Sequence, residues 1–312
     1  MRAVMYHYVR TPDPALPHLR HLHTDDFVLQ VDHLDRTEGL ARAEDVLAWL
    51  DGGGPLPSGA VLTFDDGLVD HHDTVAPILA ERDAWGVFYV PTGPYRSGTI
   101  LDVHRIHLLL GRLGGADLLA RLRAAAASEG IDLAADDRWA GRYVHQDDRP
   151  AAEAKRILNY EVRDDDRARL LDRLEADLEA EGVADRPTVD DVYVRPDQLR
   201  AMQDAGLTIG SHAVTHRVLA RLSPDEQRAE IDDSFALLDE ATGGLPWRTF
   251  CFPYGGADTY TDVTEDLLDA AGSRFGFSVD PRPVADDDRT HRRQSLPRFD
   301  CNRLPHGAAR GA

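Results

Sequence analysis

The sequence predicts an α/β fold built around a largely parallel sheet or barrel. Short runs of apolar, β-branched and aromatic residues alternate with segments of helical periodicity near both ends of the chain. Strands that alternate with helices in this way favour a parallel sheet. We expect strands at residues 4–9, 60–64, 86–90, 207–210, 249–252 and 275–279.

The clearest predicted helix begins after Ser223. The stretch SPDE places a serine at the N-cap, a proline at the first helical position and Glu226 at the third, which is typical of a capping box. An amphipathic segment follows, and the glycines at 243–244 end it.

The middle of the chain differs from its two ends. From about residue 103 to residue 199 it is rich in alanine, leucine, arginine and aspartate, with helical spacing, heavy surface charge and no convincing strand. We interpret the chain, residues 1–312, as a single domain with a helical insertion between two strands. The insertion is either a solvated cap or a lid that selects the substrate.

Composition and charge exclude several classes of protein. The 312 residues are 42% hydrophobic with mixed charge, as in soluble globular proteins, and the formal net charge is −20. This charge repels polyanions, so nucleic acid and anionic membranes are poor partners. No apolar run approaches the roughly 20 residues of a membrane span. Two cysteines are too few for a disulfide framework, and the N-terminus has no cleavable signal pattern, so we expect a cytoplasmic protein. The sequence does not predict its oligomeric state.

Two adjacent carboxylates, Asp65 and Asp66, end a buried-looking strand in the stretch VLTFDDGLVD. Burying either one unpaired costs several kcal/mol, and neighbouring carboxylates oppose each other's ionisation. One interpretation is a strand that runs out into a solvated turn, where Asp-Gly is common. The other is that one acid holds a cation while its neighbour handles protons. His71 and His72 follow this turn, and we interpret them as solvated residues at the start of a helix.

A histidine pair forms the second informative stretch, SHAVTH. His212 and His216 are four residues apart, which would place both imidazoles on one face of a helical turn. Zinc and related cations accept imidazole nitrogens and carboxylate oxygens in such an arrangement. The pair alone is weak evidence for a metal. A third stretch, FPYGG, follows a strand, and its glycines allow the backbone to turn sharply.

In this order the three stretches resemble the motifs of the polysaccharide deacetylase family, also called NodB homology domains or carbohydrate esterase family 4. The resemblance lies in TFDDG at 63–67, SHAVTH at 211–216 and FPYG at 252–255. It extends over roughly 1–95 and 200–305 and leaves the helical insertion uncovered. It implies a distorted (β/α)7 barrel whose active site lies at the C-terminal ends of the strands.

The resemblance also implies a metal centre. Asp66, His212 and His216 would bind one divalent ion, expected to be zinc, with cobalt or nickel as alternatives. Asp65 would be the general base that takes a proton from the attacking water. The cation would offset the repulsion between the two aspartates and acidify the water, which gives each carboxylate a separate role.

Residues of the third motif complete the implied site. The backbone N–H of Tyr254 would stabilise the oxyanion, and Pro253 and Tyr254 would border the substrate. Many family members carry an arginine where this chain has Cys251, and that arginine orients the catalytic aspartate. We expect Arg298 to replace it and Cys251 to be a packed thiol.

The usual late Leu-x-His motif, which supplies the general acid, is missing as well. We expect His7 to take this role; the alternatives are a structural role for His7, with His306 or solvent as the acid. One branch of the family acts on poly-N-acetylglucosamine exopolysaccharides. It resembles the chain in both differences, the missing arginine and the missing Leu-x-His motif, and in its early Tyr-His segment.

These expectations define a function and two alternatives. We expect a metal-dependent hydrolase that removes N-acetyl groups from an amino-sugar substrate, which could be a polysaccharide, an oligosaccharide or an activated precursor. One alternative keeps the chemistry but takes a non-sugar amide. The other is a catalytically silent carbohydrate-binding barrel.

Overall fold

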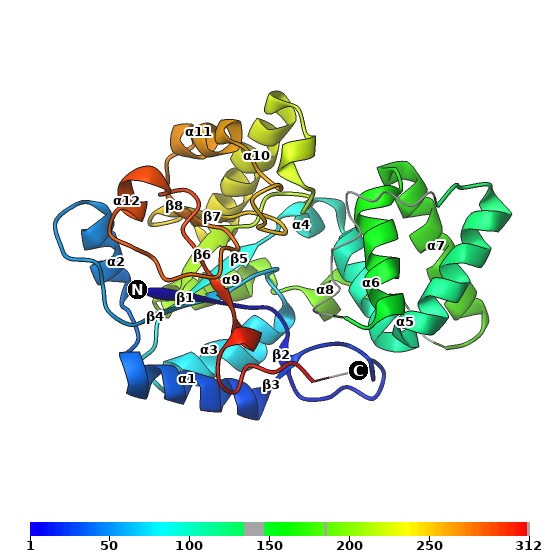
Figure 1. Cartoon of the computed structure of the whole chain (residues 1–312), viewed down its shortest axis with the longest axis horizontal. Helices are drawn as coiled ribbons and strands as arrows, with labels where there is room; N and C mark the ends of the chain where they lie inside the picture. Colours follow the sequence, from blue (N-terminus) through cyan, green and yellow to red (C-terminus); the bar gives the residue numbers. More distant parts are fainter. Residues whose placement is uncertain (134–146, 184–185, 311–312) are drawn as a thin grey trace. The chain divides into compact units, whose positions relative to one another are not determined.

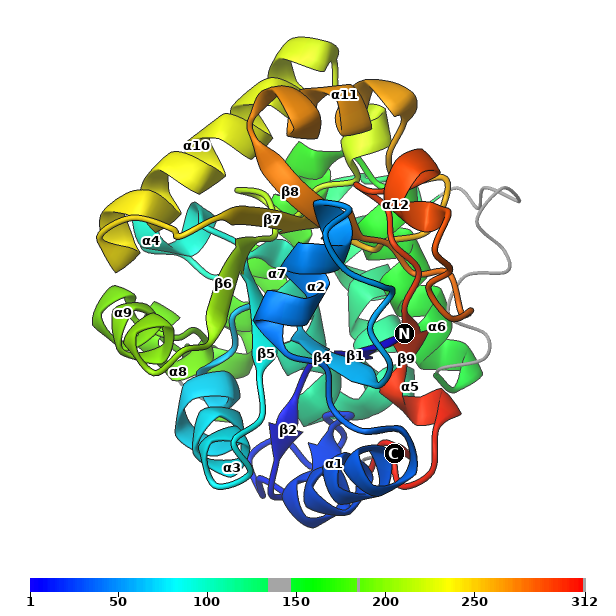
Figure 2. The same cartoon turned by 90° about the vertical axis from the view of Figure 1, so that its left-hand side faces the viewer.

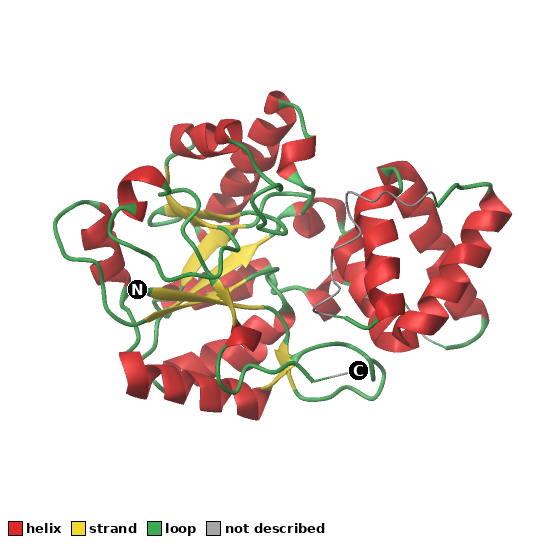
Figure 3. Ribbon diagram, in the orientation of Figure 1, coloured by secondary structure: helices red, strands yellow, loops and turns green. Residues whose placement is uncertain are grey.

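The computed structural model describes residues 1–133, 147–183 and 186–310, and it divides into two compact units (Figures 1 and 3). The first unit contains the sheet. It comprises Met1–Thr11, His21–Thr99 and Val189–Ala309. The second unit is helical and comprises chiefly Pro12–Arg20 and Ile100–Thr188. The strands of the sheet, yellow in Figure 3, all belong to the first unit.

Seven parallel strands form the sheet of the first unit, in the order β8-β7-β6-β5-β4-β1-β9. The sheet curls, and a bridge between Phe277 at the end of β8 and Leu296 ahead of β9 links its two edges. This architecture confirms the predicted distorted (β/α)7 barrel. The strands are β1 (Arg2–Tyr6), β4 (Ala60–Phe64), β5 (Gly86–Val90), β6 (Thr208–Ser211), β7 (Arg248–Cys251), β8 (Ser273–Phe277) and β9 (Phe299–Asp300).

Helices surround the strands of this unit, as Figure 2 shows. α9 and α10 pack against β6, α11 packs against β8, and α1 packs against β4. The helical elements are α1 (Thr24–Glu38), α2 (Ala43–Leu50), η1 (His71–Val75), α3 (Ala76–Ala80), α4 (Gly93–Ser97), α8 (Val189–Val192), α9 (Pro196–Asp204), η4 (Leu219–Arg221), α10 (Pro224–Thr242), α11 (Asp262–Ala270), α12 (Asp288–His291) and η5 (Cys301–Arg303).

Alternation along β4 places neighbouring side chains in different apolar cores. Successive side chains of a strand point to opposite faces, so Val61 of β4 joins one core while Leu62 and Phe64 join the other. The core that includes Val61 also contains Trp49 of α2, whereas the opposite core contains Phe27 of α1. Both faces of the strands are buried, which explains why their sequences are continuously apolar.

The capping box predicted at Ser223 is present at the start of α10, and Gly243 ends that helix in a left-handed conformation. The predicted strand at 4–9 is shorter than expected. It ends at Tyr6, whose carbonyl accepts from the N–H of Asp65 as the last bond of the β1–β4 ladder. The chain then forms β2 (Val9–Arg10), which pairs with β3 (Leu22–His23) in a separate sheet. The strands β6, β7 and β8 lie one or two residues from the predicted positions.

The second unit is built from α5 (Asp102–Glu129), α6 (Arg149–Arg156), η3 (Ile157–Glu161) and α7 (Asp164–Ala180), around a core of its own. α5 and α6 approach closely at Gly115, where a Cβ atom would lie 2.5 Å from the backbone nitrogen of Ala151. Ion pairs of Arg105 with Glu175 and Asp172 join α5 to α7. The C-terminal part of the predicted insertion, which forms α8 and the start of α9, belongs to the first unit.

No helix in the described part of the chain is long and apolar enough to cross a membrane.

Candidate active site and metal centre

The polar residues singled out in the sequence meet where parallel strands of the first unit end. Asp65 and Asp66 follow β4, His212 follows β6, and Tyr254 comes shortly after β7. His7 follows β1 directly. Because the carboxyl ends of parallel strands share one edge of a barrel, residues far apart in the sequence come together there.

Asp66, His212 and His216 form a buried group that could hold a cation. One ligand atom from each lies within 4.8 Å of the others, and all three side chains are buried. The Nε2 atoms of His212 and His216 lie 3.6 Å and 3.3 Å from Oδ1 of Asp66. One carboxylate and two imidazoles are a donor set that suits zinc and related divalent ions, and three protein ligands leave a coordination position open.

The histidine pair does not lie on a helical turn, so this expectation from the sequence is wrong. Residues 212–217 form a loop, in which Ala213 and His216 have the positive φ values of 63° and 57°. Two backbone N–H groups of the segment after β5, from Thr92 and Gly93, donate to the carbonyls of Ala213 and Val214. The left-handed turns bring the two rings to 4.8 Å in an edge-to-face arrangement.

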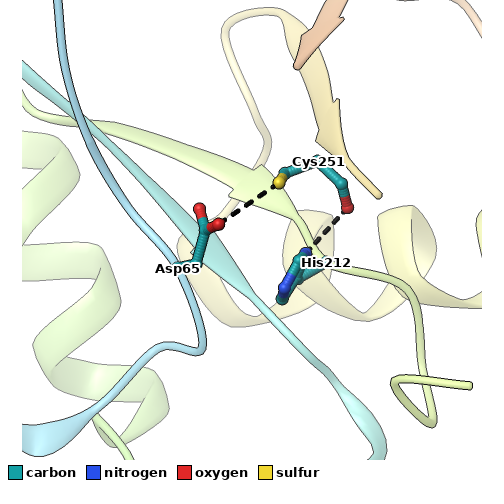
Figure 4. Close-up of side chains that lie close together, drawn as sticks. All are labelled: Asp65, His212 and Cys251. Carbon is teal, nitrogen blue, oxygen red and sulfur yellow. Dashed lines mark hydrogen bonds between the residues drawn. The ribbon is translucent and has the colours of Figure 1, made fainter. Parts of the chain in front are cut away.

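His212 has the tautomer that a metal ligand needs. Its Nδ1 lies 2.7 Å from the backbone carbonyl of Cys251, and a dashed line marks this hydrogen bond in Figure 4. A carbonyl only accepts, so Nδ1 carries the proton and Nε2 keeps a lone pair beside Asp66. Burial, together with the neighbouring His216, lowers the pKa of His212 to about 4. The imidazole is therefore neutral near pH 7, as metal binding requires.

A second group of metal-binding residue types, Asp65, His212 and Cys251, lies next to the first (Figure 4). The Cys251 thiol lies 3.5 Å from Oδ2 of Asp65, and burial raises its pKa well above the ordinary value. Asp65 already accepts a hydrogen bond from the guanidinium of Arg298. The Cys251 thiol lies 2.9 Å from the same guanidinium. A protonated thiol beside a fixed cation makes this second group a poor metal site, so the Asp66 group fits a cation better.

Arg298 reaches Asp65 from inside the barrel. It precedes β9, is 1% exposed, and its guanidinium lies over the ring of Phe277 at 5.6 Å. Nη1 and Nη2 each donate to one carboxylate oxygen of Asp65 at 2.8 Å. Burial alone would raise the pKa of Asp65, but the charge and hydrogen bonds of Arg298 outweigh burial and lower it to about 2. Asp65 is thus ionised throughout the neutral range.

His7 lies beside the candidate ligands but is open to solvent. Its Nε2 is 4.0 Å from Oδ2 of Asp66, and its side chain is 41% exposed. His71, expected to be solvated, is fully buried: its ring packs edge-on against Phe64 and lies beside Phe88, and its Nε2 lies 3.0 Å from the carbonyl of His7. His71 is the first residue of the π-helical turn η1, and its ring lies in the protein interior rather than in solvent.

The third motif lines the site beside His216. Tyr254 has a φ of 64°, and its half-buried ring lies 5.0 Å from the imidazole of His216, while Pro253 is buried. Gly255 also has a positive φ, and a Cβ atom there would lie 2.6 Å from the Val279 side chain. The turn after β7 therefore depends on glycine at this position.

Two residues of the site were not predicted from the sequence. Tyr8 follows His7 and is buried; burial, and after it the charge of Asp66, raises the pKa of its hydroxyl. Glu230 of α10 is 4% exposed and accepts from the backbone of the loop between the two histidines. A signal for Glu230 exists in the sequence, since it lies three residues after Gln227 and four before Ser234, in line with the buried face of an amphipathic helix.

Comparisons with known proteins found one family match and several structures of similar fold. The family model of polysaccharide deacetylases matches residues 174–275, which include the SHAVTH and FPYG motifs. No curated protein matches the chain in sequence.

Solved structures match over nearly the whole chain and show its fold. The deacetylase PplD of Streptococcus pyogenes, in complex with acetate, has 17% identity and a TM-score of 0.59, with 96% of this chain and 91% of PplD covered. The BpsB deacetylase domain of Bordetella bronchiseptica has 18% identity and a TM-score of 0.55, with 96% and 94% covered. IcaB of Ammonifex degensii has 16% identity and a TM-score of 0.54, with 96% and 90% covered. The family model thus matches the part of the chain that carries two of the three motifs, and the solved structures share its fold.

Proposed function

We propose that the protein is a metal-dependent hydrolase that removes N-acetyl groups from an amino-sugar substrate. One observation carries the proposal: a buried group of Asp66, His212 and His216 lies next to a second carboxylate, Asp65, that a guanidinium fixes in place. Packing alone does not require two adjacent buried aspartates, since burying them is costly without compensating charges.

In this proposal Asp66, His212 and His216 hold one divalent ion, with zinc as the first choice. The ion, when bound, acidifies water and polarises the acetyl carbonyl. The imidazoles suit this task because the Nδ1 hydrogen bond of His212 directs its Nε2 toward Asp66. Cobalt and nickel accept the same donors and are the alternatives.

The remaining residues handle protons and charge. Asp65 takes the proton of the attacking water, and Arg298 holds its carboxylate in one orientation. The backbone N–H of Tyr254 stabilises the negative charge that develops on the acetyl oxygen. His7 donates a proton to the departing amine, which is too poor a leaving group to depart unassisted. Pro253 and Tyr254 border the sugar.

We also propose that the whole chain is one deacetylase barrel, interrupted by a helical insertion. What supports this is that the helical unit has its own apolar core, and that its main segment is a continuous stretch of chain bounded at residues 99–100 and 188–189. Limited proteolysis tests the boundaries: cuts near these residues that leave two folded fragments would support them. Cuts scattered through the core of α5 and α7 would contradict them.

Acetate release tests the function. We expect the zinc-, cobalt- or nickel-loaded protein to release acetate from N-acetylglucosamine oligosaccharides, and the metal-stripped protein to release none. Release only from simple amides would favour a non-sugar substrate. Saccharide binding without release, by a protein that retains its metal, would favour a silent binding barrel.

A further inference from the structure

Glu230 of α10 makes an unusual set of contacts with the loop between the two candidate histidine ligands. Its Oε2 accepts from the backbone N–H groups of Val214 and Thr215, both at 2.8 Å, and its Oε1 accepts from the hydroxyl of Thr215. The side chain is 4% exposed, and Arg217 Nη2 lies 3.4 Å from Oε1. One buried carboxylate thus satisfies three donors of a short loop.

The loop needs such an acceptor because its backbone is strained. Ala213 and His216 are left-handed, with φ of 63° and 57°, a conformation that is sterically unfavourable for a residue other than glycine. The same turns direct the successive N–H groups of Val214 and Thr215 to one side, where they form a concave pair that favours an anion. A buried N–H without an acceptor would add a further cost.

The surroundings of Glu230 on its own helix argue against a packing role. The buried face of α10 holds the apolar Ile231, Phe235 and Leu238 and, besides Glu230, only uncharged polar residues, namely Gln227, Ser234 and Thr242. If the helix only had to pack, an apolar residue would serve better than a carboxylate, whose burial is costly. One turn later, Ser234 contacts Ser211 at the start of the same loop, at 2.5 Å between the hydroxyl oxygens. The helix therefore contacts the loop at two points.

We propose that Glu230 is a positioning residue: it holds the 212–216 loop in the conformation that directs both imidazoles at Asp66, a role that rests on the metal-dependent function proposed above. It acts through the backbone on either side of the ligands rather than through their rings. Residues that orient metal ligands typically change metal affinity about 10- to 100-fold when they are replaced. We expect a change of that size here.

The test is the affinity of the full chain for zinc, measured by competition with a chromophoric chelator. Glu230→Gln keeps the shape of the side chain but removes its charge, and its amide N–H₂ would face donors of the loop. The matched control is Glu226→Gln on the same helix, where the carboxylate accepts from Ser223 and takes no part in the loop contacts. Thermal unfolding in a chelator reports on the stability of the metal-free fold of each variant.

We expect the dissociation constant for zinc to rise about 10- to 100-fold in Glu230→Gln and to stay within about twofold of wild type in Glu226→Gln. Turnover of Glu230→Gln should recover in part at saturating zinc, which a purely structural defect would not do. Should Glu230→Gln fail to fold, Thr215→Val removes one donor to the same carboxylate and should weaken zinc binding about fivefold.

Three results would overturn the inference. An affinity of Glu230→Gln, or of its substitute Thr215→Val, equal to that of wild type would show that the loop holds itself. An equal loss in Glu226→Gln would assign the effect to helix stability. A wild-type protein that binds no divalent ion would overturn the proposed function as well, so the two failures are distinguishable.

Discussion

Nη1 and Nη2 of Arg298 each donate a hydrogen bond to one carboxylate oxygen of Asp65, at 2.8 Å, although the two residues are 233 positions apart in the sequence. The thiol of Cys251 lies 2.9 Å from the same guanidinium. This bidentate pair of hydrogen bonds from the planar guanidinium restricts both rotation and displacement of the Asp65 carboxylate.

Replacing Arg298 with lysine should therefore lower turnover while the metal stays bound. Lysine keeps the positive charge, so Asp65 is not left buried and unpaired, but it donates as a point charge and cannot hold both oxygens. A misplacement of the reacting group by about 1 Å costs on the order of 10²-fold in rate. The measurement is kcat together with metal content. The control is Arg303→Lys, at an exposed arginine of η5; turnover of Arg298→Lys near that of the control would contradict the orienting role.

Asp65→Asn should retain the metal and lose turnover by about 10²- to 10⁴-fold, the range for a lost general base. The asparagine amide group also presents N–H donors to the guanidinium of Arg298, so part of the loss reflects a disturbed pair. Metal content by mass spectrometry and acetate release would be compared with Asp73→Asn, at an exposed aspartate. If Asp65→Asn strips the metal, Asp65 is a ligand rather than the base.

Alanine at His212 or at His216 should remove the metal and the activity together. Each imidazole supplies one of three ligand atoms that lie within 4.8 Å of one another, and two remaining ligands bind a divalent ion weakly. The check is metal content after dialysis, with activity measured before and after zinc is added back. A crystal grown in zinc, in which these side chains point apart, would contradict the assignment.

Local patterns in the sequence account for much of the fold. The strands at 60–64 and 86–90 lie where predicted, because both faces of these strands are buried and the apolar runs have clear ends. The start of α10 at Ser223 was also predictable, since a capping box depends only on residues within one turn. By contrast, the end of β1 depends on the ladder with β4, which no local pattern contains.

The conformation of the site was less predictable than its composition. The motifs identified Asp65, Asp66, His212 and His216, but four-residue spacing suggested a helical turn where a left-handed loop exists. That loop depends on hydrogen bonds that its backbone donates to Glu230, 14 to 18 residues away from the two histidines in the sequence. Tertiary contacts of this kind override local preference, so a pattern of spacing alone gives the ligands but not their geometry.

The ion pair of Asp288 with Arg282 should make stability depend on pH. Two bonds of 2.7 Å join the side chains, and Arg282 lowers the pKa of Asp288. An aspartate whose pKa is lowered on folding stabilises the protein above its unfolded value of about 3.9, and this contribution is lost as pH falls through the folded value. Asp288→Asn should thus cost about 1 kcal/mol at pH 7, and the difference from wild type should shrink below pH of about 4.

Urea midpoints at several pH values check this prediction. Asp232→Asn, at an exposed position of α10, serves as the control and should leave the midpoint nearly unchanged at every pH. A loss in Asp288→Asn that stays constant from pH 7 down to pH of about 3 would contradict the link to ionisation.

His7 is the residue that we expect to protonate the departing amine. Its Nε2 is 4.0 Å from Oδ2 of Asp66, and its side chain is 41% exposed, so a substrate can reach a ring that lies beside the candidate ligands. The buried His71 lies 3.0 Å from the His7 carbonyl, which fixes the backbone there. The rival histidines have other contacts: His306 lies against His33 of α1, and Nδ1 of His291 bonds to the carbonyl of Asp287.

The kinetics of two substrate classes distinguish an acid from a structural residue. An amide needs a proton on its leaving nitrogen, whereas an activated acetate ester does not. His7→Ala should therefore keep its metal, lose kcat on N-acetyl sugars by about 10²-fold or more, and lose much less on the ester. The control is His291→Ala, at an exposed position of α12. Equal losses on both substrates would assign His7 a structural role, and unchanged amide turnover would move the acid to His306 or to solvent.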